Sequence, residues 1–302
     1  MINFIKKTSL FAFIIIIFIG TCELLIRNNK DNMYSYKHNY IIENGNNINS
    51  LIFGSSHGFF GVMPKYLNQP AFNLANDSQP IRMDYGLLQG YMKYFDNLET
   101  VIITISYGSL RGSGWRTEKS AIHKVKYSLY MDANIDNKFI YNFAISSTKF
   151  FPGALKSCFR PNKELRCDSL GWGTSYHIDN KRTEWEGDIS EAAIKRHTHS
   201  HTEYLSANIN CLENMIALCK ENNIRPIIIT APTWHSYYDN LDKTQYDEML
   251  DVVNNLQNKY NIEYYNFIKD SRFEADDFYD GDHLSNIGAG KFTKILADTL
   301  GI

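Results

Sequence analysis

Two short motifs near opposite ends of the chain carry the residue types that acyl-transfer chemistry uses. One is Gly54-Ser55-Ser56-His57, directly after the apolar run 50–53, and the other is Asp280-Gly281-Asp282-His283. A serine hydroxyl is a poor nucleophile unless a histidine takes its proton and a carboxylate orients that histidine. The sequence therefore predicts a catalytic triad, provided that the fold brings the two motifs together.

Ser56 is the candidate nucleophile, His283 the base and Asp280 the orienting carboxylate. A D-x-x-H spacing lets the carboxylate of Asp280 reach across one turn to Nδ1 of His283, which would fix the tautomer of the imidazole. Ser55 stays open as the nucleophile, and Asp282 as the orienting carboxylate. A non-catalytic interpretation stays open too, since glycine and serine are common after strands and polar residues commonly cap helices.

Composition narrows the function class. The chain has 302 residues, of which 44% are hydrophobic, enough for one large core or two smaller ones. A net charge of −2 gives no electrostatic basis for binding nucleic acid. Aromatic residues make up 14% of the chain, an abundance that suits either carbohydrate stacking or ordinary core packing.

The N-terminal segment has the composition of a membrane-spanning helix. Lys6 and Lys7 precede the apolar stretch from Thr8 to Ile26, in which Glu23 is the only charged residue. A helix of this length spans about 28 Å, close to the thickness of the hydrocarbon core of a bilayer. The two lysines favour the cytoplasmic side, so the chain after Arg27 is expected outside the cytoplasm.

We expect residues 1–27 to be an uncleaved signal anchor that holds an extracytoplasmic domain, either periplasmic or on the outer face of the cytoplasmic membrane. A cleaved signal peptide is the alternative, but no A-x-A-like site follows the apolar stretch. Residues 19–22, Ile-Gly-Thr-Cys, match a lipoprotein cleavage box only in part, because threonine stands directly before the cysteine.

The cysteines agree with an exterior location. Cys158 and Cys167 flank a short polar loop and could form a disulfide in an oxidising compartment. Cys211 and Cys219 are too far apart on a predicted helix to form one, and are expected to be small core residues. No cysteine or histidine spacing typical of a structural zinc site is present.

Beyond the anchor, residues 28–49 are expected to be a stalk, and strand and helix patterns then alternate over residues 50–302. Apolar runs predict strands at 50–53, 71–74, 100–106, 226–230 and 262–267, and helical periodicity appears at 83–95, 202–221, 246–260 and 286–299. The continuously apolar runs indicate a parallel sheet buried on both faces. The predicted fold is therefore α/β, with three α/β/α layers around a parallel central sheet.

One stretch breaks this alternation. Residues from about 109 to 200 contain scattered Gly, Trp, Arg, His and Ser and no regular βα repeat. Long insertions in compact domains are often lids or binding loops. We therefore expect an insertion that covers the active face.

Taken together, three motifs resemble those of the SGNH (GDSL-type) hydrolase and acyltransferase superfamily. They are Gly54-x-Ser56, Asn73-Leu-Ala-Asn76 after the second predicted strand, and Asp280-x-x-His283-Leu. The closer similarity is to the membrane-anchored envelope branch, which includes the D-alanyl-lipoteichoic acid transfer protein and alginate O-acetyltransferase-like proteins. The resemblance covers residues 50–106 and 224 to the end, and it implies a flavodoxin-like SGNH fold.

The resemblance also implies a catalytic arrangement. Ser56 is the implied nucleophile, with His283 as base and Asp280 as its orienting partner. The implied oxyanion donors are the backbone N–H groups of Ser56 and Ala75. The third donor of the family, an Asn after the third strand, is replaced here by Ser-Tyr-Gly at 106–108, so we expect Asn76 or a group from the insertion to substitute.

Other polar and aromatic residues are candidates for contacting substrate. Trp234 and His235 follow the fourth predicted strand and should therefore lie on the same sheet edge as Ser56. Asn73 and His57 belong to the motifs themselves and are candidate substrate contacts as well.

A metal site is an open alternative for the segment 197–201. Its three alternating histidines, His197, His199 and His201, have a spacing that could hold zinc or copper. Arg196 and His197 could instead contact substrate. The triad itself needs no metal and no cofactor.

The sequence thus predicts a serine-dependent O-acyltransferase or esterase. By resemblance, its substrate is an acyl group on a cell-envelope polysaccharide, and a membrane acyl-transfer partner could supply the acyl donor. A non-catalytic glycan-binding or assembly protein on the same scaffold is the alternative, because the third oxyanion donor is missing. A metal-dependent hydrolase that uses the three histidines is a further alternative.

Overall fold

The computed structural model describes residues 1–116, 120–131, 133, 139–160 and 165–302. Two compact units make up the chain. The smaller unit comprises Met1–Asn39 and Trp115–Leu165, and the larger unit comprises Tyr40–Gly114 and Arg166–Ile302.

The larger unit contains a five-stranded parallel sheet with the order β2-β1-β3-β4-β5. The strands are β1 (Ser50–Gly54), β2 (Ala71–Asn73), β3 (Thr100–Thr104), β4 (Arg225–Thr230) and β5 (Glu263–Asn266). This order is the flavodoxin-like arrangement of a doubly wound sheet. The predicted α/β fold with a parallel central sheet is confirmed.

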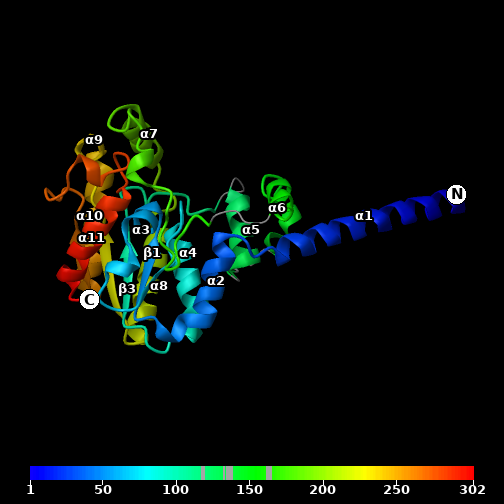
Figure 1. Ribbon diagram of the computed structural model, residues 1–302, viewed down its shortest axis with the longest axis horizontal. Helices are drawn as coiled ribbons and strands as arrows, with labels where there is room; N and C mark the ends of the chain where they lie inside the picture. Colours follow the sequence, from blue (N-terminus) through cyan, green and yellow to red (C-terminus); the bar gives the residue numbers. More distant parts are fainter. Residues whose placement is uncertain (117–119, 132, 134–138, 161–164) are drawn as a thin grey trace. The chain divides into compact units, whose positions relative to one another are not determined.

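Helices flank this sheet, as Figure 1 shows for the larger unit. Helix α11 packs against α3, and α4 packs against α8, which also contacts α10. The α-helices of this unit are α3 (Ser56–Gly61), α4 (Ile81–Tyr91), α7 (Asp188–His197), α8 (Leu205–Glu221), α9 (His235–Tyr238), α10 (Lys243–Tyr260) and α11 (Asn286–Leu300). Short 3-10 turns lie at Gly45–Asn47, Pro64–Tyr66, Met92–Tyr94, Ile178–Asn180 and Ala275–Asp277.

The burial of the strands explains why the apolar runs in the sequence predicted them. Residues 51–53 of β1, 101–103 of β3 and 227–229 of β4 are all fully buried. Because helices cover both faces of the sheet, the side chains on both faces are apolar. Each strand is therefore a continuous apolar run in the sequence and not an alternation of apolar and polar residues. Helix α8 shows the other pattern, burying the stripe Leu212, Met215, Ile216 and Cys219 on one side.

Helix caps fix where the last helix begins. The Ser285 side chain accepts a hydrogen bond from the Gly288 N–H at 3.3 Å and so caps α11. At the other end, Gly301 has a φ of 70° and ends the helix in the left-handed conformation. His283 lies two residues before the Ser285 cap.

The segments expected to be a stalk and an insertion are divided between the units. Residues 28–49 contain helix α2 (Met33–Asn44), and the Tyr40 ring in this segment stacks on Phe72 of the larger unit with ring centroids 4.2 Å apart. Within the expected insertion, Trp115–Leu165 belongs to the smaller unit. The remainder, from Arg166 onward, folds with the larger unit and contains α7.

The smaller unit is built around the end of the long N-terminal helix α1 (Ile2–Asn28). The other helices described in this unit are α5 (Ala121–Tyr130) and α6 (Phe151–Ser157), with 3-10 turns at Phe139–Asn142 and Ala144–Ser146. Ile26 is fully buried in its core, and the Tyr130 hydroxyl donates a hydrogen bond to the Ile26 carbonyl at 3.2 Å. Helix α1 is the one helix in the described part of the chain that is long and apolar enough to cross a membrane, as signal anchors and signal peptides are.

The expected Cys158–Cys167 disulfide is absent, and both residues are free cysteines. Cys158 belongs to the smaller unit, where its thiol donates to the Ala154 carbonyl at 3.3 Å. Cys167 belongs to the larger unit and pairs with Gly173 in an isolated β-bridge. The short sequence separation misled the prediction because the boundary between the two units lies between these residues.

A buried carboxyl holds the end of β1. Asp84 of α4 accepts the Gly54 N–H at 3.1 Å and the Gln79 side-chain amide at 2.6 Å. The same Gln79 amide donates to the Leu74 carbonyl at 3.2 Å. Burial raises the pKa of Asp84 to about 7, although the two hydrogen bonds oppose the rise. This network joins the two loops that follow β1 and β2.

We predict that Asp84→Asn changes how stability depends on pH. Between about pH 4 and pH 7 the folded protein keeps the Asp84 proton that the unfolded chain releases, so wild-type stability falls as pH rises, by up to about 4 kcal/mol. The variant should lack this fall. Urea unfolding of the full-length protein in detergent at several pH values measures it, with the exposed Asp298→Asn as control. Equal pH slopes for wild type and Asp84→Asn would contradict the prediction.

Candidate active site

The site lies at the carboxyl edge of the sheet, where β1 turns sharply into α3. Gly54 ends β1 with a φ of +130°, and a Cβ at this position would lie 2.5 Å from the Thr104 carbonyl oxygen of β3. Only glycine fits such a turn. The turn places Ser56 as the first residue of α3, with its side chain at the edge where open α/β sheets bind ligands.

Ser56, His283 and Asp280 form a continuous chain of hydrogen bonds. Ser56 Oγ lies 2.8 Å from His283 Nε2, and His283 Nδ1 lies 2.9 Å from Asp280 Oδ1. Asp280 Oδ1 also accepts the backbone N–H groups of Asp282 at 3.1 Å and His283 at 2.9 Å, which hold the carboxylate in place. The fold thus brings together the two motifs predicted from the sequence, 227 positions apart.

Backbone contacts from three elements fix the loop 280–283. Phe278 and Leu284 pair as an antiparallel bridge, and the Tyr279 N–H donates to the His283 carbonyl at 2.9 Å. The Trp234 N–H, just before α9, donates to the Gly281 carbonyl at 2.8 Å. A Cβ at position 281 would lie 1.9 Å from Ser190 Oγ of α7, so any larger residue there would have to displace the Ser190 side chain.

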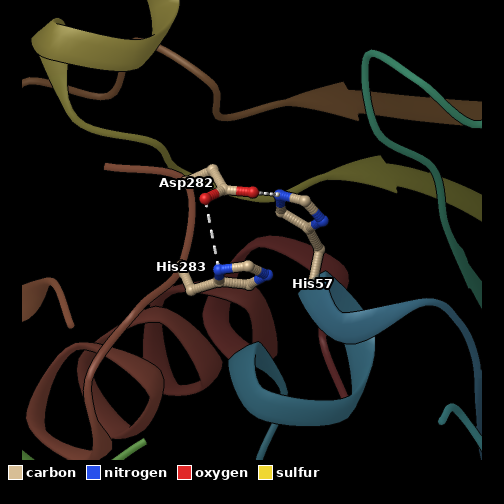
Figure 2. A group of neighbouring side chains, drawn as sticks. All are labelled: His57, Asp282 and His283. Carbon is tan, nitrogen blue, oxygen red and sulfur yellow. Dashed lines mark ion pairs between the residues drawn. The ribbon is translucent and has the colours of Figure 1, made fainter. Parts of the chain in front are cut away.

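Asp282 lies among three histidines. Its carboxylate oxygens are 3.3 Å from His283 Nδ1, 3.6 Å from His197 Nδ1 and 3.9 Å from His57 Nε2. Figure 2 shows the carboxylate between His57 and His283. Only 1% of its side chain is exposed, yet neither oxygen has a hydrogen-bond partner in the described structure. Asp280, with three donors, is therefore the residue that orients the His283 ring, and Asp282 acts on it through charge.

The two stacked imidazoles of the site, His57 and His283, have pKa values shifted in opposite directions. Burial disfavours a charge on His283, but the carboxylates of Asp280 and Asp282 outweigh burial and raise its pKa well above the usual value. Burial, and then the charge of His283, lower the pKa of His57 to about 3. The two rings are stacked with centroids 4.9 Å apart. His57 is thus neutral at neutral pH, whereas His283 readily accepts a proton.

Two of the expected oxyanion donors are occupied. The Ala75 N–H donates to Asn73 Oδ1 at 3.0 Å and to the Ile52 carbonyl at 3.1 Å. The Asn76 side-chain amide donates to Gln79 Oε1 at 3.1 Å. As placed, these groups stabilise the loop after β2 and do not point to a reacting carbonyl. The Ser56 N–H differs, because the first N–H of a helix has no acceptor within that helix.

Asn73 also has a structural position. Its side chain is fully buried, and its amide donates to the carbonyls of Gly58 and Val62, both at 2.9 Å. These bonds attach helix α3 to the end of β2. The substrate contact expected for Asn73 does not follow from this placement.

Trp234 and His235 lie beside the loop 280–283, on the edge of the sheet where they were expected. Trp234 is half-buried, and its indole N–H donates to Glu186 at 3.0 Å. Its ring lies 5.5 Å from the Trp185 ring. His235 is exposed at the start of α9. These residues form an aromatic border next to the triad.

The sequence did not point to Tyr176, although its ring contacts the triad. This ring stacks on Phe60 and on Tyr279, with centroids 3.8 and 4.3 Å apart, and meets His283 edge-on at 5.0 Å. Tyr176 lies in the irregular insertion, where no periodicity identifies which side chains face inward. Tyr237 lies in α9, three residues after Trp234, and its hydroxyl lies 2.8 Å from His197 Nδ1.

The three histidines of the alternative metal site are not brought together. His197 lies at Asp282, whereas the rings of His199 and His201 pair with each other, 5.7 Å apart. Within the described ranges, the one group of three whose ligand atoms lie within 4.8 Å of one another is His57, Asp282 and His283. Both ring nitrogens of His283 already bind Ser56 and Asp280, so an ion here would disrupt the triad.

Comparison with known proteins finds a matching family model and similar solved structures. A family described as "Protein of unknown function (DUF1574)" matches residues 179–300, a range that includes Asp280 and His283 but not Ser56. A solved structure described as "a putative platelet activating factor from Streptococcus pneumonia" is similar with a TM-score of 0.45 and 10% identity, over 97% of this chain and 99% of that one. No curated protein matches the sequence.

We predict that the raised pKa of His283 depends on Asp282. In Asp282→Asn, the pKa of His283 should fall, because one of the two neighbouring negative charges is removed. His57 should stay neutral throughout the range above about pH 4. NMR titration of the full-length protein with labelled histidines measures both, and His283→Gln assigns the signal. A His283 pKa that Asp282→Asn leaves unchanged would contradict this account of the site.

Proposed function

We propose that this protein is a serine-dependent acyl-transfer enzyme, an esterase or an O-acyltransferase. The hydrogen-bond chain from Ser56 through His283 to Asp280 carries the proposal. Each of its distances is within the range at which a base can take a proton from a hydroxyl group. Ser56 begins α3 at the end of β1, and Asp280 and His283 lie in the loop just before the capped start of α11.

The reaction proceeds in two steps. The deprotonated form of His283, which the raised pKa shifts to higher pH, takes the Ser56 proton at Nε2 while Oγ forms a bond to the carbonyl carbon of the acyl donor, and Asp280 stabilises the imidazolium. The Ser56 N–H binds the oxyanion. The intermediate then collapses, the donor's oxygen leaves with the proton from His283, and an acyl ester on Ser56 remains.

An acceptor hydroxyl group completes the cycle. His283 takes its proton, the acceptor oxygen attacks the ester carbonyl, and Ser56 leaves with the proton returned from Nε2. A sugar hydroxyl as acceptor makes the enzyme a transferase, and water makes it an esterase. We favour transfer to or from a cell-envelope polysaccharide, because the motifs resemble the anchored envelope branch of SGNH enzymes and Trp185 and Trp234 offer aromatic faces beside the triad. In that case, a membrane acyl-transfer partner would supply the acyl groups.

We further propose that α1 is retained as an uncleaved signal anchor, with the larger unit outside the cytoplasm. The last turns of α1 belong to the core of the smaller unit, where Cys22, Glu23 and Ile26 are buried. Cleavage after the apolar stretch would remove these residues and leave the Ala144 N–H without the Glu23 carboxylate that accepts it at 2.8 Å. Such a loss would destabilise the unit.

The protein purified from membranes should therefore retain residues 1–28. Mass spectrometry of the intact protein, with peptide mapping of the N-terminus, measures this directly. A mature chain that begins after residue 22 would rule out the anchor. A version with an A-x-A site inserted directly after residue 32 serves as the control that export and processing are working.

The nucleophile is tested by covalent labelling. Full-length protein in detergent should bind a fluorophosphonate at Ser56, and Ser56→Ala and His283→Ala should lose labelling together with about 1,000-fold or more of the turnover of an activated ester. Ser55→Ala is the matched control and should retain both, because Ser55 lies in β-conformation one residue before α3. Equal labelling of wild type and Ser56→Ala would end the proposal.

The occupied donors favour one second candidate. The Ala75 N–H and the Asn76 amide already donate hydrogen bonds within the protein. The site therefore has fewer free oxyanion donors than expected from its resemblance to SGNH enzymes. A non-catalytic glycan-binding or assembly protein would tolerate this, because it has no oxyanion to stabilise. Glycan binding by the full-length protein without ester turnover, unaffected by Ser56→Ala, would favour this candidate over the enzyme.

A further inference from the structure

The single charge within the apolar stretch of α1 has a defined position in the smaller unit. Glu23 Oε1 accepts the Ala144 N–H at 2.8 Å, and Oε2 accepts the Ile145 N–H at 3.4 Å. The guanidinium of Arg27, one turn further on, lies 3.5 Å from Glu23 and donates to the Asn142 carbonyl. The segment 139–146 is thereby attached to the last two turns of α1.

This segment and the adjoining turn of α1 expose large apolar side chains. Phe139 is 74% exposed, Ile140 58% and Ile145 42%. Leu24 and Leu25, on the same turns of α1, are 61% and 41% exposed. We refer to these five residues as the apolar collar. Grouped exposure of this kind is costly in water and marks a surface that another apolar phase covers.

The attachment to α1 sets the depth of the collar. Glu23 lies three residues before Ile26, which is about 4.5 Å along the helix axis. The backbone of Ile145 is bonded at that level, inside the stretch that the sequence marks as membrane-spanning. Arg27 and Asn142 lie one turn further out, at the level where polar groups meet headgroups.

We propose that the apolar collar inserts into the outer leaflet of the bilayer, so that the smaller unit rests on the membrane around the anchor. Lipid is the favoured occupant because the collar is continuous with the apolar surface of α1, whose side chains from Ile2 to Phe18 are largely exposed. It also explains Glu23, since the hydrogen bonds from the segment 139–146 satisfy its carboxylate at the membrane edge. The inference rests on the proposed anchor and is independent of the catalytic site.

Site-specific photo-cross-linking tests the proposal. Full-length protein carrying p-benzoylphenylalanine at position 139 or 145 is placed in nanodiscs of phosphatidylethanolamine and phosphatidylglycerol and irradiated. Intact-mass spectrometry then measures adducts of one phospholipid. Ile42 in the larger unit is the matched control, because it is 44% exposed, close to the 42% of Ile145. Position 13 in α1 reports whether the helix itself is in the membrane.

We expect lipid adducts at 139 and 145 that exceed those at 42 several-fold and approach those at 13. Adducts at 139 and 145 no greater than at 42, with lipid still captured at 13, would overturn the collar and leave the anchor intact. Cross-links from 139 or 145 to the larger unit or to a second copy would overturn it as well, by identifying a protein surface as the occupant. No lipid at 13 would overturn the anchor and the collar together.

Discussion

The hydrogen bond between Ser56 and His283 is the constraint on which the larger unit depends. It joins two residues 227 positions apart, and the parallel sheet brings them together, because all of its strands end at the same edge. Gly54 supplies the turn that exposes Ser56, and Ser285 supplies the N-cap at which α11 begins, just after His283. Each end of the bond is thus set by ordinary backbone geometry.

Charge is the second factor that organises the site. Asp280 and Asp282 lie beside one imidazole, so a protonated His283 leaves one excess negative charge in a buried place. His57 and His197 border the second carboxylate while remaining neutral. Asp280 holds the geometry of the His283 ring, and both carboxylates, Asp280 and then Asp282, raise its pKa.

The smaller unit is built onto the end of the long apolar helix. Its core includes Ile26, so the boundary between the exposed part of this helix and the folded unit falls within α1 and not after it. Glu23 marks that boundary, because a buried carboxylate needs donors and the segment 139–146 provides them. The one charged residue of the apolar stretch is therefore the point where the helix enters the folded unit.

The sequence by itself determined the five strands, the α8 stripe and the pairing of Ser56 with His283 and Asp280, because these rest on local periodicity and on the shared edge of a parallel sheet. Only the tertiary structure decided the rest. It turned the side chains of Asn73 and Asn76 inward, brought Tyr176 and His197 to the site, and left Cys158 and Cys167 as free cysteines. Such contacts depend on how irregular segments pack. These segments have no hydrophobic periodicity from which their inward-facing side chains could be predicted.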